Sequence, residues 1–92
     1  MTTLCVVFKS TPENYKVESS DLKNNTSRIV DLKDERFHIL EDAARDFDFD
    51  AKVDLNVQII NTKTKESFTR KVRHVCFWKG QCVITWDPKV SA

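Results

Sequence analysis

The sequence predicts an α+β fold: a single small domain, residues 1–92, in which an antiparallel sheet of about 4–6 strands carries one helix, at about residues 33–48, on one face. Three observations lead to this prediction. Several short stretches place apolar residues at every second position, as half-buried strands do. One stretch places them at spacings of three and four, as an amphipathic helix does. Hydrophobic residues make up 40% of the chain and charged residues 32%, which fits one modest core.

The first third of the chain predicts two strands and a loop. Residues 3–8 are β-branched, aromatic and mostly apolar, so we expect a central strand that is buried on both faces. Residues 10–14 predict a turn, and the weak alternation over residues 15–19 predicts a second strand, antiparallel to the first. Residues 20–27 are polar and predict a loop. Residues 28–32 fit either a short strand or the first turn of the helix.

The predicted helix starts near residue 33, with Asp31 or Asp34 as its N-cap. Its apolar stripe consists of Phe37, Ile39, Leu40, Ala43, Ala44 and Phe47.

The remaining residues predict three strands. Residues 52–60 alternate regularly, with Val53, Leu55, Val57 and Ile59 facing the core. A polar turn follows, and residues 66–78 predict a long strand. Its apolar parity shifts between Val72 and Val75, which indicates an inserted bulge residue. Lys79 and Gly80 predict a two-residue hairpin turn before the last strand, residues 81–86.

This turn fixes the register of the last hairpin. The predicted pairs are Trp78 with Gln81, Phe77 with Cys82, Val75 with Ile84, and Arg73 with Trp86. Cys82 then faces the core, whereas His74 and Cys76 face the other side of the sheet.

The glycine and cysteine content excludes several classes of protein. The chain has one glycine, where average usage would give roughly six. Phosphate-binding loops need several glycines at fixed spacing, so nucleotide-binding loops of that kind are excluded. Three cysteines cannot all pair within the chain, and none stands in a C-x-x-C arrangement. We therefore expect reduced, buried thiols. The chain has no apolar run long enough to span a membrane, and its first segment does not resemble a signal peptide. We therefore also expect a cytosolic protein.

The net charge of the chain is only +1, because two segments of opposite charge cancel each other in the total. Residues 31–54 contain nine acidic and four basic residues, and residues 61–80 contain six basic and one acidic residue. Either these segments are separate docking surfaces, or they lie side by side and neutralise each other.

The docking interpretation gives two sets of candidate partner-binding residues. The basic hairpin comprises Lys63, Lys65, Arg70, Lys71, Arg73, His74, Trp78 and Lys79. The acidic edge comprises Asp42, Asp46, Asp48, Phe49 and Asp50.

Metal sites are not expected. The D-x-D-x-D spacing of residues 46–50 resembles a calcium loop, but Ala51 stands where that loop needs glycine and Val57 where it needs glutamate. His74, Cys76 and Cys82 lack a fourth zinc ligand, and the predicted register puts Cys82 on the other face. No combination of residues indicates a catalytic site, so we expect no enzyme activity, no metal and no cofactor.

The sequence therefore predicts a small, non-enzymatic, cytosolic protein-binding module, an inhibitor or adaptor that acts through its acidic and basic surfaces and not at a membrane. By analogy, small regulators of viruses and mobile genetic elements have this organisation. An open sheet edge also allows a homodimer. The alternative is a nucleic-acid-binding protein in which the hairpin of residues 63–79 contacts phosphates and Trp78 stacks on a base.

Overall fold

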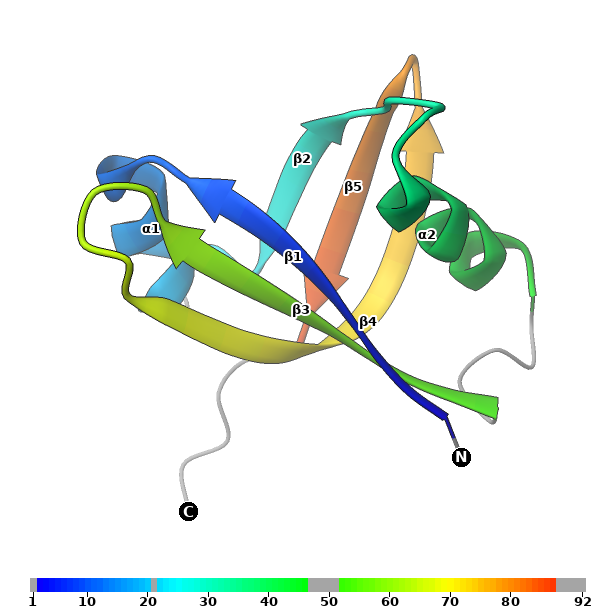
Figure 1. Ribbon diagram of the computed structural model, residues 1–92, viewed down its shortest axis with the longest axis horizontal. Coiled ribbons are helices and arrows are strands. Elements are labelled where there is room, and N and C mark those ends of the chain that lie inside the picture. The colour runs from blue at the N-terminus through cyan, green and yellow to red at the C-terminus, as the bar shows by residue number, and fades with distance from the viewer. Residues whose placement is uncertain (1, 21, 47–51, 88–92) are drawn as a thin grey trace.

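The computed structural model describes residues 2–20, 22–46 and 52–87. Within these ranges the elements are, in order, β1 (Thr2–Ser10), α1 (Pro12–Ser19), β2 (Asn25–Ile29), α2 (Glu35–Arg45), β3 (Val53–Asn61), β4 (Ser67–Trp78) and β5 (Gln81–Trp86). The strands form one five-stranded sheet in the order β1-β3-β4-β5-β2 (Figure 1). The predicted α+β class is confirmed. Neither of the two helices in these ranges has the length and apolar character that crossing a membrane requires.

β1 lies at an edge of the sheet, so the prediction of a central strand at residues 3–8 is wrong. β1 pairs with β3 in parallel, which makes the sheet mixed and not wholly antiparallel. Val6 and Phe8 are buried, but Cys5 and Val7 on the alternate face are exposed. The apolar run correctly indicates a strand. Its place in the sheet depends instead on a long-range pairing with residues about fifty positions away in the chain.

α1 replaces the turn and second strand predicted for residues 10–19. Thr11 caps this helix, accepting a hydrogen bond from the backbone N–H of Asn14 at 3.4 Å, and Pro12 occupies its start, where a missing N–H costs nothing. Tyr15 then packs against the Phe68 ring, with centroids 5.5 Å apart. Local capping and this contact outweigh the weak alternation on which the strand prediction rested.

β2 begins at Asn25 and pairs with β5 in antiparallel orientation, so part of the predicted loop at residues 20–27 is a strand. This strand also continues through Arg28 and Ile29, the first residues of the stretch that was open between strand and helix.

α2 lies inside the predicted range, and Asp34 is its N-cap, accepting from the backbone N–H of Arg36 at 3.0 Å. Phe37 and Leu40 are buried and Ala43 is half-buried. Ala44, predicted for the core, is exposed, so α2 buries a narrower stripe than expected. Phe47 lies outside the described residues.

β3 and the β4–β5 hairpin follow the predictions closely. The inward residues of β3 are buried or half-buried as expected. Lys79 and Gly80 both have positive φ, 49° and 76°, as a two-residue hairpin turn requires. Three of the four predicted pairs are present. Trp86 pairs with Val72 and not Arg73, because the predicted bulge inserts Arg73 into β4.

The sheet is strongly curved, and β4 bends through its middle (Figure 1). The core fills the concave face, where both helices pack. It comprises Val6, Phe8, Phe37, Leu40, Leu55, Val57, Ile59, Val72, Val75, Cys82, Ile84 and Trp86. The convex face carries no helix in the described part of the chain.

Candidate functional site

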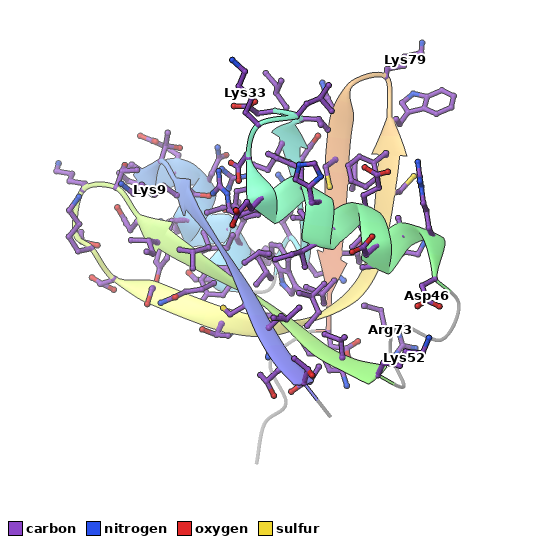
Figure 2. The ribbon with its side chains drawn as sticks, turned by 45° about the vertical axis from the view of Figure 1, so that its right-hand side comes forward. Lys9, Lys33, Asp46, Lys52, Arg73 and Lys79 are labelled. Carbon is purple, nitrogen blue, oxygen red and sulfur yellow. The ribbon has the colours of Figure 1, made fainter. Side chains whose placement is uncertain are left out.

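The predicted basic hairpin does not form one continuous patch. Lys63 and Lys65 lie in the turn before β4, whereas Lys79 lies in the turn after it, so the 12-residue β4 separates them. Figure 2 shows Lys79 at the tip of the β4–β5 hairpin and Arg73 below α2.

Arg70 faces away from the other cations of β4. Its guanidinium lies 4.8 Å from the centroid of the Phe68 ring, and Nη2 donates to the carbonyl of Ser19 at 3.3 Å. These contacts are on the concave side, towards α1. Lys71, the next residue along the strand, is exposed on the convex side.

Two cations of the basic hairpin form ion pairs, one of them with a carboxylate of the acidic segment. Lys71 pairs with Asp54 at 4.0 Å, which joins the two charged segments, and Arg73 pairs with Asp87 at 3.7 Å. Such exposed pairs contribute little to stability, but they reduce the local charge. The two segments therefore do not form two uniform faces of opposite sign.

The acidic edge is described only in part. Asp42 is exposed on α2, and Asp46 follows the helix and pairs with Lys52 at 3.4 Å. Asp48, Phe49 and Asp50 lie outside the described residues.

Trp78 is the largest exposed aromatic side chain, with 66% of its surface accessible, and Lys79 Nζ lies 5.6 Å from the centroid of its indole ring. Ile29, 81% exposed, and Leu32, 79% exposed, add apolar surface near the same end of the molecule. The backbone N–H of Val30 donates to the carbonyl of Gly80 at 2.9 Å, which holds the β2–α2 loop against the hairpin turn.

A groove separates α2 from β4 and has a volume of about 690 Å³. It is lined by Val30 and Leu32 of the β2–α2 loop, by Phe37, His38, Glu41, Ala44 and Arg45 of α2, and by residues 74–81 of the hairpin. We call it the α2–β4 groove. The candidate residues His74, Trp78 and Lys79 all contribute to it.

One wall of this groove is a strand edge. β3 pairs with β4 only as far as Lys71, so over Val72–Trp78 no described strand pairs with β4 on the side away from β5. We call this side the free edge of β4. The sequence indicates it only indirectly, because the strand predicted at residues 66–78 is longer than its neighbours.

The hydrogen-bonding pattern shows which backbone groups point outward from the free edge. Val30 bonds Gly80 and Asn24 bonds Trp86, so the even-numbered residues of β5 direct their backbone groups towards β2. The odd-numbered residues of β5 therefore bond the β4 residues opposite them, His74, Cys76 and Trp78. By the same alternation, the N–H and C=O groups of Val75 and Phe77 point away from β5, out of the free edge, and both residues line the groove.

The cysteines do not form a metal site with His74. Cys82 is buried on the concave face, while Cys76 and His74 are exposed on the convex face, as the predicted register requires. Among the described residues no three His, Cys, Asp or Glu side chains form a group able to hold a metal ion. Cys5 and Cys76 are exposed, so the expectation of buried thiols is correct only for Cys82. Burial raises the pKa of the Cys82 thiol to about 11.

Comparisons with protein-family models, with curated proteins and with solved structures found no match for this chain.

Proposed function

We propose that this protein is a non-enzymatic protein-binding module, an inhibitor or adaptor, and that it binds an extended segment of another protein along the free edge of β4. The observation that carries the proposal is the outward direction of the backbone groups of Val75 and Phe77 beside an apolar groove. An extended peptide that adds to such an edge gains main-chain hydrogen bonds, and pockets beside the edge select its side chains.

The surroundings of the edge support this function. Phe37, Leu32 and Ala44 offer apolar surface in the groove, and Trp78 stands exposed beside it. Exposed aromatic residues are enriched at the centres of protein interfaces. Arg73 and Lys79 flank this edge, and such charges discourage pairing with an identical edge while leaving it open to a strand of opposite charge. Three free cysteines, two of them exposed, support a reducing compartment such as the cytosol.

Peptide selection combined with amide exchange tests the proposal. A random library of displayed peptides is panned on the immobilised protein, and selected peptides are added to the labelled protein for hydrogen exchange by NMR. We expect the amides of Val75 and Phe77 to exchange rapidly in the free protein and to become protected when a peptide binds. Cys76 and Trp78, already bonded to β5, serve as internal controls. If no peptide is selected, or if selected peptides leave Val75 and Phe77 unprotected, the proposal is wrong.

Single-stranded nucleic acid is the second candidate partner. The observation that favours it is the exposed indole of Trp78 beside the ammonium group of Lys79, a combination on which bases stack. The separation of the other cations along β4 disfavours it, because a nucleic-acid backbone needs a continuous basic track.

A further inference from the structure

We infer that the segment bound at the free edge of β4 is a strand in which apolar and acidic residues alternate, and that it belongs to another protein and not to a second copy of this chain. The inference rests on the proposed function and specifies the chemistry of the partner. It follows from the different character of the two sides of the edge and from the charges at its two ends.

An added strand would place its side chains alternately on the concave and convex sides of the sheet. On the concave side they would enter the α2–β4 groove beside Val75 and Phe77, opposite Phe37 and Ala44 of α2. This side offers mainly carbon surface and accepts apolar side chains.

On the convex side the neighbours of the added strand are an imidazole, a thiol and an indole, and the cations lie at the two ends of the edge. By the alternation of β4, His74, Cys76 and Trp78 lie on this side. Figure 2 shows Arg73 towards one end of the edge and Lys79 at the other. The nearby carboxylate of Asp87 is 3.7 Å from Arg73, whose side chain remains largely exposed and able to meet a second carboxylate. Acidic side chains on this side of the partner therefore complement the edge, and basic ones do not.

Charge also argues against pairing with a second copy. Two copies of the chain could pair their free edges in antiparallel orientation about a two-fold axis. In two such registers both Val75 and Phe77 lie opposite a residue of Val72–Trp78 of the other copy. In both registers the two strands run in opposite directions, so the Lys79 end of one copy's edge lies beside the Arg73 end of the other's. Like charges close together across an antiparallel pair destabilise it, so both registers are disfavoured.

Three synthetic peptides test the inference. The first is a seven-residue peptide with Leu or Val at odd positions and Glu at even positions. The second has Lys in place of each Glu. The third is the acidic peptide with N-methyl groups on alternate backbone nitrogens, which removes the donors that would face β4. Binding is followed by acrylamide quenching of tryptophan fluorescence, because Trp78 is 66% exposed and Trp86 only 1%.

We expect the acidic peptide to bind roughly five- to tenfold more tightly than the lysine peptide at low salt, with the difference shrinking as salt is added. The N-methylated peptide should lose most of its affinity. The double substitution Arg73→Glu and Lys79→Glu should reverse the preference. A matched pair, Lys63→Glu and Lys65→Glu, at the other end of β4, should leave it unchanged.

The outcomes separate this inference from the proposed function. If library peptides of another pattern protect the amides of Val75 and Phe77, but the acidic peptide binds no better than the lysine peptide, the edge is a binding site and the inference is wrong. If concentrated protein forms a dimer that protects the same amides, the partner is a second copy and the inference is also wrong. If no peptide protects these amides and no dimer forms, the proposed function fails with it.

Discussion

Glu18 and Arg28 are joined through one hydroxyl group: Ser10 Oγ donates to Glu18 Oε1 at 2.8 Å and accepts from Arg28 Nη2 at 2.8 Å. Arg28 also donates through Nη1 to the carbonyl of Lys9 at 2.6 Å. Because β1 and β2 are the two outer strands of the curved sheet, these bonds connect its opposite edges without a backbone ladder. Glu18 is 1% exposed, so the bond from Ser10 satisfies a carboxylate that burial has removed from water.

We predict that Glu18→Ala destabilises the fold by about 1–3 kcal/mol, because the buried hydroxyl of Ser10 loses its acceptor. Glu18→Gln keeps an acceptor oxygen and should cost less. The measurement is the free energy of unfolding in urea. The control is Glu13→Gln, the same chemical change at an exposed position of α1, which should shift stability by less than about 0.5 kcal/mol. Equal effects at residues 18 and 13 would show that the network contributes nothing.

The hairpin turn gives a second prediction. Gly80 has φ of +76°, and a Cβ added there would meet no atom within 4 Å, so the cost of substitution is conformational and not steric crowding by neighbours. Gly80→Ala should therefore cost about 1–2 kcal/mol, and Gly80→Val more, because β-branched residues tolerate positive φ least. Gly80→Asn should retain most of the stability, since asparagine adopts this conformation more readily.

Thermal unfolding measures this series. A loss of 1 kcal/mol corresponds to roughly 4–8 °C in Tm for a domain of this size. The expected order of Tm is wild type, Asn, Ala, Val. An unchanged Tm for Gly80→Val would mean that the turn does not hold the β4–β5 register.

The success of the hairpin predictions and the failure of others have a common physical cause. The turn at Lys79 and Gly80 and the bulge at Arg73 are encoded by neighbouring residues, so the register of β4 and β5 can be predicted locally. The edge position of β1 depends on pairing between distant segments and leaves no local signal. α1 is a different case, because Thr11 and Pro12 do carry a start signal for a helix, which the polar turn-like composition obscured.

The candidate site likewise contains residues that local sequence reveals and a groove that depends on long-range pairing. Trp78, His74 and Lys79 could be selected from their residue types on one predicted strand and the turn that follows it. The separation of Arg70 from Lys71 follows from strand alternation and was also predictable in principle. The α2–β4 groove was not, because it exists only where β3 stops pairing at Lys71 and α2 passes beside the unpaired half of β4.

For nucleic acid, we predict no retarded band in a gel-shift experiment with single-stranded or double-stranded RNA and DNA at low salt. Lys71 and Arg73 each have a carboxylate within 4.0 Å, and Arg70 points to the concave side. Too few cations remain together to release counterions from a phosphate backbone. A shift that weakens steeply with salt and is lost in Trp78→Ala would contradict this prediction and favour the second candidate function.

The three thiols should differ in reactivity with a disulfide reagent such as DTNB. Cys5 and Cys76 are exposed and should react in the native protein, whereas Cys82 is buried and its pKa is raised to about 11, so almost none of it is thiolate at neutral pH. We expect Cys5 and Cys76 to react in the fast phase, Cys5 the more slowly because partial burial raises its pKa, and Cys82 to react at the rate of unfolding. The variant Cys82→Ala should remove the slow phase and leave the fast phase unchanged.

The same pKa gives the sign of a stability change at high pH. The pKa of a cysteine in the unfolded chain is 9.0, and the pKa of Cys82 in the fold is about 11. Between these two pH values the folded state therefore holds a proton that the unfolded state has released. Raising the pH through this window therefore lowers the free energy of unfolding. Urea unfolding at pH 8 and pH 10.5 measures the change, with Cys82→Ala as the reference in which this contribution is absent. An equal loss of stability in both proteins would mean that Cys82 ionises in the fold as readily as in the unfolded chain, and that its burial does not suppress the thiolate.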